Sequence, residues 1–385
     1  MLKSLAKITG CALTLAIAAS IHAQVGTPAA QGVTASAVTA AQKFLGTLND
    51  TQRARAAYAF NDPIKPNWHN LPPQMHTRAG VRMMDLSPAQ RELAQAVVKS
   101  VLSNYGYSKV QNIISADEYL GTDMGVGFPT GPGAYMLAIF GTPSATAPWS
   151  IQYNGHHLGV NVTLVGANDV LAPTLTAAYP NMYVKDGKQI FVLGDEANRA
   201  LKLIQSLDNS HRAKATAPMQ IWDFLLGPGH DGQVLQPEGL KGSEMTTAQK
   251  EMLLDVAAAW VNIINEGTAQ AKMAEIRRTI DDTYFLWSGD TTRAGNAYFR
   301  VQGPTIWIEY SPQVLGGPGS ARGGGGRARG GRDGGAPLEG RGRDNFEAAL
   351  NDPNRKLDPT HVHTVYRDFT NDYAKRFIAA QSAQR

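Results

Sequence analysis

The stretch Tyr-Phe-Arg-Val-Gln-Gly-Pro-Thr-Ile-Trp-Ile-Glu-Tyr, residues 298–310, contains two short runs of alternating side chains on either side of Gly303-Pro304. Glycine and proline mark a tight turn, and alternation with a period of two is typical of a strand with two different faces. The stretch therefore predicts a β-hairpin, and the parity of each strand assigns its side chains to one face. The more polar face carries Tyr298, Arg300, Gln302, Thr305, Trp307 and Glu309.

Other parts of the chain show the same alternation. The further strand-like stretches are residues 135–140, 151–165 and 361–367. In the second of them, His157 falls on a polar face and His156 on an apolar one. In the third, His361, His363 and Arg367 share a face. If these strands belong to one sheet, a single polar face holds His157, Asn161, Arg300, Gln302, Glu309, His361, His363 and Arg367.

Helical patterns surround these strands. The clearest begins at Ser87-Pro88, where serine can cap the first turn and proline fits the first helical position, and it ends at Gly106. Others cover residues 40–60, 195–207, 247–264, 272–280 and 372–381. Because helices and strands come in separate groups, the sequence predicts an α+β fold. We expect one large domain, residues 40–385, in which a mixed or antiparallel sheet with one polar face packs against several helices.

The N-terminus resembles an export signal. Lys3 and Lys7 precede a short apolar run, residues 8–20, and Ile21-His22-Ala23 offers a cleavage point. This pattern predicts a signal peptide over residues 1–23, followed by a linker over residues 24–39. The mature protein would then be periplasmic or extracellular, with no stable membrane insertion. The sole cysteine, Cys11, lies in the signal, so the mature chain cannot use a thiol nucleophile or cysteine metal ligands.

Composition excludes several function classes. Hydrophobic residues make up 43% of the 385-residue chain, which is enough for a large core. A formal net charge of +4 is too small to indicate a nucleic-acid partner. We find no glycine-rich dinucleotide or phosphate-binding motif, and we expect no nucleotide cofactor. The glycine- and arginine-rich segment 316–345 is predicted to be a disordered insertion; an interaction protein that binds through this segment is a further alternative.

The histidines suggest a metal site. His361 and His363 are two residues apart in a predicted strand, so both imidazoles can converge on one ion. His157 and Glu309 would complete the site on the same face, and His156 is a further candidate ligand. Three histidines and one carboxylate suit Zn, Cu, Fe or Mn. The alternative is that this face of the sheet lies in solvent, where histidines are common.

Several motifs resemble the domain of unknown function 3500 family. They are Gly141-Thr-Pro-Ser144, Trp149, Gly155-His-His-Leu-Gly-Val-Asn161, Tyr298–Pro304, Ile308-Glu-Tyr310 and Thr360–Asp368. The resemblance runs from about residue 40 to the end of the chain. Two departures are Ser311-Pro312-Gln313, where the family has Asp-Asn-x-Gln, and the Gly/Arg insertion. The resemblance implies no reaction, but it implies that the pattern is carried by His156, His157, Arg300, Gln302, Glu309, His361, His363, Arg367 and Asp368.

The leading hypothesis is an exported metal-dependent hydrolase that acts on a small anionic substrate. The candidate metal ligands are His361, His363, His157, His156 and Glu309. The candidate catalytic residues are Glu309 as a general base, His157, Arg367 and Asp368. The candidate substrate-binding residues are Arg300, Gln302, Asn161 and Trp307. Two alternatives use the same site, namely a copper- or iron-dependent oxidoreductase and a non-catalytic periplasmic binder of a metal or an anion. The oligomeric state stays open.

Overall fold

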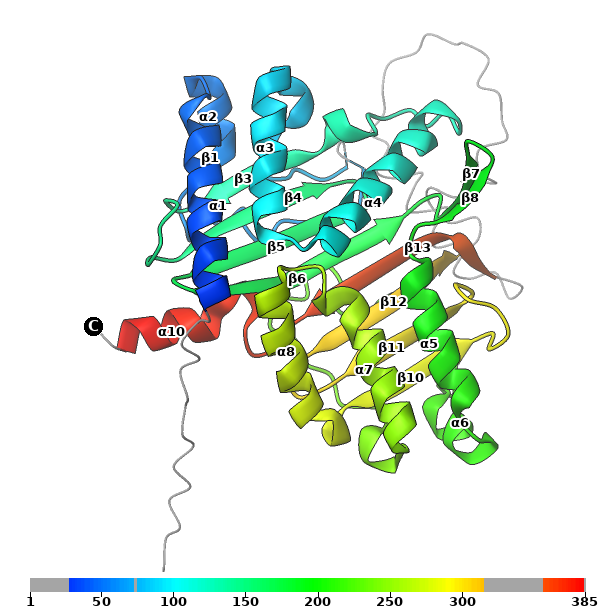
Figure 1. The fold of residues 1–385 in the computed structure, drawn as a ribbon. Coiled ribbons are helices and arrows are strands. Elements are labelled where there is room, and N and C mark those ends of the chain that lie inside the picture. Colours follow the sequence, from blue (N-terminus) through cyan, green and yellow to red (C-terminus); the bar gives the residue numbers. More distant parts are fainter. Residues whose placement is uncertain (1–27, 73–74, 315–355, 384–385) are drawn as a thin grey trace, which may run out of the picture.

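A long twisted sheet runs through the whole molecule, as seen in a computed structural model that describes residues 28–72, 75–314 and 356–383 (Figure 1). Its strands are ordered β1-β3-β4-β5-β6-β13-β12-β11-β10-β9, with β2 beside β3. Only the β1–β3 pair is parallel among the pairs of this sheet that the structure describes. The predicted α+β class and the mostly antiparallel sheet are thus confirmed.

The strands have the following bounds. The sheet contains β1 (Ala57–Tyr58), β2 (Val81–Arg82), β3 (Met136–Phe140), β4 (Trp149–Gly155), β5 (Leu158–Val165), β6 (Asn168–Ala178), β9 (Leu240–Lys241), β10 (Tyr284–Gly289), β11 (Ala297–Gln302), β12 (Trp307–Val314) and β13 (Leu357–Arg367). A separate hairpin is formed by β7 (Met182–Lys185) and β8 (Lys188–Phe191). The hairpin predicted at residues 298–310 is β11 and β12, with Arg300 directly opposite Glu309.

The strand nearest the C-terminus lies in the middle of the sheet. β13 pairs with β6 on one side and with β12 on the other, so it joins the half of the sheet built from β3–β6 to the half built from β9–β12. His363 of β13 is thereby opposite Ala177 of β6 and Ser311 of β12. This placement brings the C-terminal histidines beside the β4–β5 turn. His157 of that turn and His361 of β13 are neighbours in space although they are 204 positions apart in the sequence.

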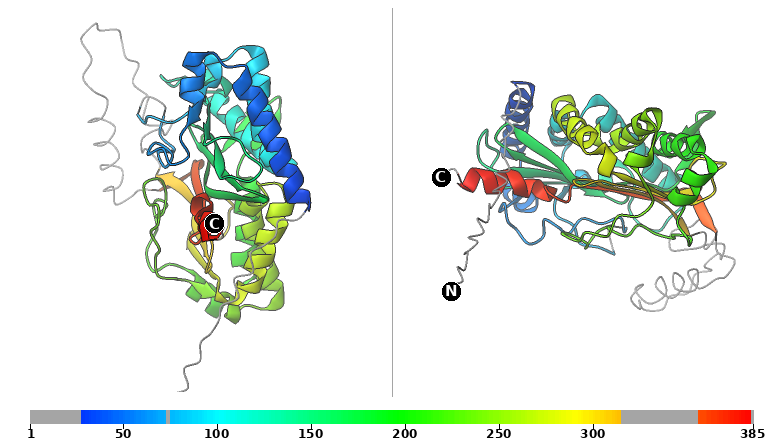
Figure 2. Two further views of the ribbon diagram at one scale, coloured as in Figure 1. Left: turned by 90° about the vertical axis from the view of Figure 1, so that its left-hand side faces the viewer. Right: turned by 90° about the horizontal axis from the view of Figure 1, so that it is seen from below.

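The helices cover one face of the sheet (Figure 2). They are α1 (Pro28–Gly46), α3 (Pro88–Val101), α4 (Asn104–Thr122), α5 (Gly194–Ser206), α7 (Thr247–Val261) and α8 (Glu266–Arg278). Three shorter helices are α2 (Asp50–Ala56), α6 (Asn209–Ala215) and α10 (Lys375–Ala383). The apolar face of the strands packs against this helical layer, and its side chains, such as Val160, Phe299 and Ile308, are at most 1% exposed. Parity in the sequence therefore assigned the core face correctly.

Two irregular segments cover the opposite, polar face. We call residues 59–72 with 75–80 the first cover loop, and residues 217–239 the second cover loop. Gln152 donates to the carbonyl of Lys65 in the first loop (2.9 Å), and Gln302 donates to the carbonyl of Leu235 in the second (2.6 Å). The polar face is therefore buried, with Glu309 at 0% exposure, and the alternative that it lies in solvent is wrong.

Several predicted helix boundaries are wrong. The helix predicted at residues 40–60 is interrupted at residues 47–49, and the helix predicted from residue 272 begins at Glu266. The helix that begins at Ser87 ends at Val101, and a second helix, α4, starts after the N-cap Ser103. Gly106, the predicted end, lies in the first turn of α4, where an added Cβ would fall 2.0 Å from the carbonyl oxygen of Ile263. Gly106 is therefore a position where helix α4 packs closely against the backbone of Ile263. From the sequence alone, a glycine of this kind looks the same as one that ends a helix.

The first helix also begins earlier than predicted. α1 starts at Pro28, inside the stretch 24–39 that the sequence analysis assigned to a linker. Its buried face is made by Ala37, Ala41 and Phe44, each fully buried. Because alanine is only weakly hydrophobic, an alanine-rich helix shows little difference between its buried and exposed faces. The helical pattern could therefore be recognised only from about residue 40, where larger apolar side chains begin.

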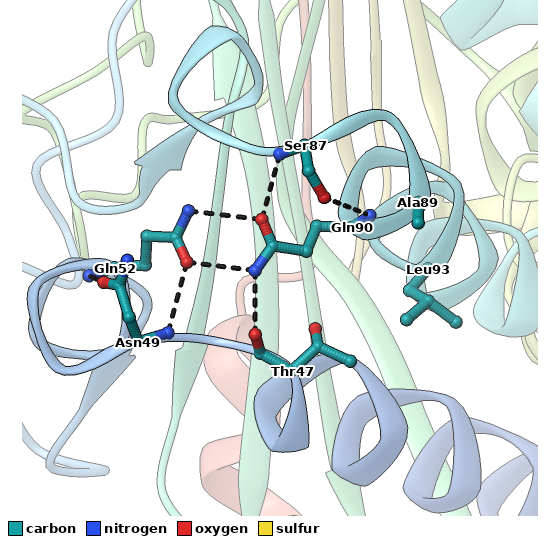
Figure 3. A pocket seen from close by; sticks show the side chains of 7 residues that line it. All are labelled: Thr47, Asn49, Gln52, Ser87, Ala89, Gln90 and Leu93. Atoms are coloured by element: carbon teal, nitrogen blue, oxygen red, sulfur yellow. Dashed lines mark hydrogen bonds between the residues drawn. The ribbon is translucent and has the colours of Figure 1, made fainter.

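Linked caps hold the first three helices together (Figure 3). Asn49 with Gln52 caps α2, and Ser87 with Gln90 caps α3, each as a reciprocal capping box. The two glutamine side chains also bond each other, and Nε2 of Gln90 reaches the carbonyl of Thr47 at the end of α1 (2.8 Å). A surface hollow of about 390 Å³ lies over this network. Because every polar group there serves a cap, we assign the hollow a structural role.

The docking of α8 on β6 involves a buried carboxylate. Asp169 of β6 accepts hydrogen bonds from the side chains of Asn265, the N-cap of α8, and Thr268. Burial raises the pKa of Asp169 from 3.8 to about 6. Between these two values the folded protein keeps a proton that the unfolded chain has lost, so stability should fall as the pH rises through this window.

We expect the free energy of unfolding to fall by about 3 kcal/mol across this pH window because of Asp169. The variant Asp169→Asn cannot ionise at this position, so it should not show this decrease. The difference in unfolding free energy between wild type and variant should therefore shift between pH 3.8 and about 6. Urea unfolding over that range measures it. Asp186→Asn, at the exposed β7–β8 turn, is the matched control and should run parallel to wild type. A constant difference for Asp169→Asn would contradict the prediction.

Two sequence predictions lie outside the described residues. They are the signal peptide, residues 1–23, and the Gly/Arg insertion, residues 316–345. Among the helices that the structure describes, none has both the length and the hydropathy required to cross a bilayer.

Candidate metal centre

The turn between β4 and β5 presents the first histidine of the site. The sequence analysis placed His156 and His157 on a strand, which is wrong: both form the two-residue turn between Gly155 and Leu158. His157 adopts a φ of +66°, which is uncommon for a residue other than glycine. Its carbonyl accepts a hydrogen bond from the amide of Ala177 (2.8 Å), which fixes the turn against β6. Its side chain therefore reaches toward β13.

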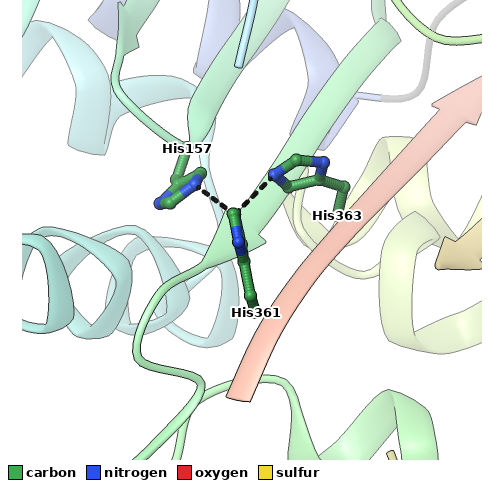
Figure 4. A group of neighbouring side chains, drawn as sticks. All are labelled: His157, His361 and His363. Carbon is green, nitrogen blue, oxygen red and sulfur yellow. Dashed lines mark hydrogen bonds between the residues drawn. The ribbon is translucent and has the colours of Figure 1, made fainter. Parts of the chain in front are cut away.

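Three imidazoles meet at this point (Figure 4). Nε2 of His361 lies 3.2 Å from Nε2 of His157 and 3.0 Å from Nε2 of His363. Each histidine offers one ring nitrogen as a ligand atom, and these three nitrogens all lie within 4.8 Å of one another. All three residues are at most 6% exposed. The structure thus brings together His157, His361 and His363, as strand parity predicted for the last two.

This convergence has a chemical meaning. A neutral imidazole carries one N–H and one lone pair, which lies in the ring plane. Nε2 of His361 therefore cannot make good hydrogen bonds to both neighbours at once, but three lone pairs can share one cation. In a tetrahedral zinc site with Zn–N distances of about 2.0–2.1 Å, the nitrogens would be about 3.3 Å apart. The observed 3.0 and 3.2 Å are close to that spacing.

Burial keeps these rings neutral. Desolvation, and to a smaller extent the charge of His156, lowers the pKa of His361 to about 3. Desolvation, the neighbouring histidines and the charge of Arg78 hold the pKa of His157 well below its usual range. The pKa of His363 is lowered in the same way, by burial first and then by His361. Neutral imidazole is the form that binds a metal, so the site is ready for an ion at neutral pH.

Side chains from three segments enclose the histidines. The ring of Tyr179 stacks on His361 at 4.6 Å, and Phe224 of the second cover loop lies 5.7 Å from His363. The amide of Asn70 in the first cover loop lies 3.2 Å from Nδ1 of His363. A half-turn of this amide would place its oxygen there, so that Nδ1–H donates to it and Nε2 keeps its lone pair for a metal.

A buried hydroxyl faces the same region. Ser311 lies directly opposite His363 in the β12–β13 ladder and is 0% exposed. Within the part of the chain that the structure describes, its Oγ has no hydrogen-bond partner. Directly opposed residues have Cβ atoms about 5 Å apart, so this hydroxyl is available to a group bound beside His363. The sequence analysis noted Ser311 only as a departure from the family pattern.

Glu309 is engaged elsewhere. Its carboxylate accepts four hydrogen bonds, from the amides of Leu225 (2.7 Å) and Leu226 (2.9 Å), the hydroxyl of Tyr298 (2.7 Å) and the indole of Trp307 (2.6 Å). Among the described residues it is not part of a group that could hold a metal. Glu309 therefore holds the second cover loop on the sheet, and the structure does not bring it to the histidines.

Arg367 and Asp368 likewise use their charged groups for contacts within the fold. Arg367 donates to the carbonyls of Leu226 and Gly227, both at 2.7 Å, and pairs with Asp231 (2.6 Å) and Asp372 (3.2 Å). Asp368 pairs with Lys272 at 2.7 Å. Arg367 thus shares the task of Glu309, since both hold the second cover loop.

The four candidate substrate-binding residues also contact other parts of the protein, although Nε of Arg300 and Oε1 of Gln302 have no hydrogen-bond partner among the described residues. Arg300 pairs with Glu238 at 2.9 Å and stacks over the ring of Trp307, with 4.8 Å to its centre. Gln302 binds the second cover loop, as described above. Asn161 accepts a hydrogen bond from Gln152 (2.6 Å) and donates to the carbonyl of Pro173 (2.7 Å). All four lie on the predicted face, yet their contacts serve the fold.

The sequence analysis missed Asp117, which lies on α4. Its Oδ1 is 2.7 Å from Nδ1 of His156, and its Oδ2 accepts from the amide of Gly131 (2.9 Å). The ring of His156 in turn stacks on His157, with 3.7 Å between centres and 27° between planes. Asp117, His156 and His157 thus form a second buried group whose ligand atoms all lie within 4.8 Å of one another, so they too could hold a metal ion. Because Nδ1 of His156 is bonded to Asp117 and its ring is stacked on His157, we assign His156 to positioning His157 and keep the three-histidine group as the candidate centre. The N-cap signal of Ser103 could have revealed α4.

We expect Asp117→Asn to weaken metal binding roughly 10- to 100-fold, because the carboxylate orients His156 and His156 holds the ring of His157. His156→Phe should preserve the stack and recover part of the affinity, whereas His156→Ala should not. Competition with a chelator measures the affinity, and the visible spectrum of the cobalt-loaded protein reports the ligand geometry. The control is Asp123→Asn at the exposed end of α4. Unchanged affinity in both Asp117→Asn and His156→Ala would contradict the assignment.

Comparison with known proteins agrees with the sequence motifs. No curated protein and no solved structure matches this chain. A family model described as "Protein of unknown function (DUF3500)" matches residues 30–375, which is nearly the whole chain and includes all three histidines. The chain therefore belongs to the DUF3500 family.

Proposed function

We propose that this protein is an exported enzyme that binds one transition-metal ion through His157, His361 and His363 and hydrolyses a small anionic substrate there. The observation that carries the proposal is the convergence of three buried, neutral imidazoles at 3.0 and 3.2 Å. Export rests on the signal-like residues 1–23. The site chemistry rests on the geometry alone, because family membership implies no reaction.

The donor set favours an open metal site. Catalytic zinc sites use three protein ligands and leave the fourth position to water, whereas structural sites are closed by four protein ligands. In the part of the chain that the structure describes, no carboxylate joins the three histidines in one possible metal-binding group. A bound ion of this kind would lower the pKa of its water to about 7 and supply hydroxide at neutral pH. All-imidazole ligation also suits copper, iron and nickel.

The surrounding residues suit a small reactant. The hydroxyl of Ser311 can accept or donate a hydrogen bond to a group held beside His363, because it has no partner among the described residues. Asn70, Tyr179 and Phe224 enclose the histidines and keep bulk water away. Exclusion of water strengthens every electrostatic interaction inside the site. Glu309 is not needed for this proposal.

The test is to load the protein with cobalt(II) and follow its visible spectrum while azide is added. The proposal predicts one cobalt per chain in a four-coordinate spectrum that azide changes, because a small anion can take the open position. A non-catalytic binder with a filled coordination sphere predicts a spectrum that azide leaves unchanged. Failure to bind cobalt, zinc or copper at all would refute the proposal.

The alternative function, a copper- or iron-dependent oxidoreductase at the same site, can be distinguished by the metal that the native protein contains. If the protein as purified from its host contains copper or iron, the oxidoreductase alternative replaces hydrolysis, since these metals can change oxidation state and imidazole suits both. Zinc favours hydrolysis because it has no redox chemistry. Elemental analysis of the native protein therefore selects between the two chemistries.

A further inference from the structure

Arg78, at the end of the first cover loop, is a buried cation without an acidic partner. It is 6% exposed, and its guanidinium donates to the backbone carbonyls of His69 (2.8 Å), His76 (3.3 Å) and Leu71. Its Nε has no hydrogen-bond partner among the described residues. Nε of Arg300 likewise has no partner among the described residues. Arg300 and Arg367, the other buried arginines of the polar face, nevertheless each pair with a carboxylate, and Arg78 does not.

A buried guanidinium bound only to carbonyls is unusual. Charged side chains inside a protein are normally paired, because an unpaired ion loses its hydration without compensation. Asp117 is close enough for its charge to stabilise the Arg78 cation, but its two oxygens are bonded to His156 and Gly131. The free Nε–H, together with the lack of a directly bonded carboxylate among the described residues, thus leaves Arg78 able to bind an anion.

The position of Arg78 links it to the histidines. Asn154 of β4 donates to the carbonyl of Ala79, the residue after Arg78, at 3.2 Å. Asn154 lies only two residues before the His156-His157 turn, and its own Oδ1 has no partner among the described residues. Arg78 is also one of the charges that act on His157. A donor and an acceptor without partners therefore flank the turn that presents the first ligand of the proposed metal.

We infer that Arg78 forms an anion-binding subsite beside the three-histidine centre and that its ligand is the carboxylate of a small organic acid. A single charge with one free donor at Nε fits a carboxylate, whereas a phosphate dianion would call for more donors. The inference rests on the proposed function and gives its substrate class: an acid that places its carboxylate on Arg78 and its reacting group near the histidines.

The probe is acetate, added to the cobalt-loaded protein and followed by its visible spectrum and by thermal unfolding. We expect saturable binding that Arg78→Gln weakens at least 10-fold, with both proteins compared at saturating cobalt. Arg78→Lys should retain more of the acetate affinity because it keeps the charge. Arg82→Gln, which removes a half-exposed arginine paired with Asp85, is the control and should bind acetate like wild type. Equal acetate affinity in Arg78→Gln and wild type would overturn the inference.

Two further measurements separate the possible failures. Acetamide has the shape of acetate without its charge, so equal binding of the two by the wild type overturns the inference even if Arg78→Gln does not fold. If the protein takes up no metal, the proposed function fails. Acetate should then still raise the melting temperature of the wild type and not that of Arg78→Gln; a melting temperature independent of acetate would overturn the subsite as well.

Discussion

A His361→Ala/His363→Ala double variant should bind no transition metal, whereas the wild-type protein should bind about one ion per chain. The variant keeps only His157 of the three converging imidazoles, and a single imidazole holds an ion far too weakly to survive dialysis. The second group, Asp117 with His156 and His157, is also kept, but its His156 is already bonded to Asp117, so we expect no ion to remain there after dialysis. Elemental analysis after dialysis gives the stoichiometry. Metal should also raise the melting temperature of the wild type and leave that of the variant unchanged, because a ligand stabilises only the state that binds it.

The matched control removes two other histidines. The side chain of His211 bonds to Asp208, the N-cap of α6, and His230 lies exposed in the second cover loop. His211→Ala/His230→Ala therefore lowers the histidine content equally and should keep the full metal stoichiometry. Equal metal in the wild type and in the His361/His363 variant would show that the ion binds elsewhere, and the proposed centre would be wrong.

Glu309→Gln should lower the free energy of unfolding by about 3 kcal/mol or more. The hydroxyl of Tyr298 can turn and accept from the new NH2 group, but the N–H groups of Leu225, Leu226 and Trp307 cannot. At least one of these N–H groups therefore loses its partner, at a cost of about 1–3 kcal/mol, and the remaining hydrogen bonds lose a charged acceptor, which weakens each by about 1 kcal/mol. The second cover loop should loosen first, because Leu225 and Leu226 are held there by this residue. Urea unfolding gives the free energy, and limited proteolysis should cut within residues 217–239.

Glu238→Gln is the control, since it changes a glutamate of the same loop that is 67% exposed. An exposed pair contributes about 0–1 kcal/mol, so this variant should unfold almost like wild type. The result also decides between two roles for Glu309. A stable, protease-resistant Glu309→Gln protein that has lost its metal would return Glu309 to the ligand or general-base role that the sequence suggested.

Alternation in the sequence was enough to predict the faces of the central strands. Because side chains change face at every residue of a strand, the pattern of residues 298–310 correctly predicts that Arg300 and Glu309 lie on the same face of the hairpin. The same rule placed His361 and His363 together. The helix after Ser87 followed from its N-cap serine and the proline at its first position, and the helix from Thr247 followed from its apolar periodicity. The structure adds a capping box at the start of each.

Other parts of the site could not be predicted in this way. The turn at His156-His157 lacks the Gly, Asn or Asp that marks a two-residue hairpin, so β4 and β5 read as one strand. β6 is rich in Ala and Thr and lacked a clear alternation. Asp117 and Arg78 reach the site from a helix and a loop, where no periodicity relates a residue to a distant strand. Burial of the polar face likewise depends on irregular loops.

The central place of β13 has a consequence for the order of assembly. Two of the three proposed ligands lie on this strand, which follows every other described strand in the sequence and pairs with β6 and β12, strands that end more than 40 residues before it begins. Pairing between such distant segments is slow, because a long intervening loop must close first. The centre thus cannot form until β13 has been made and has paired with both neighbours. For an exported chain, metal uptake would follow translocation, and the ion would come from the compartment of destination.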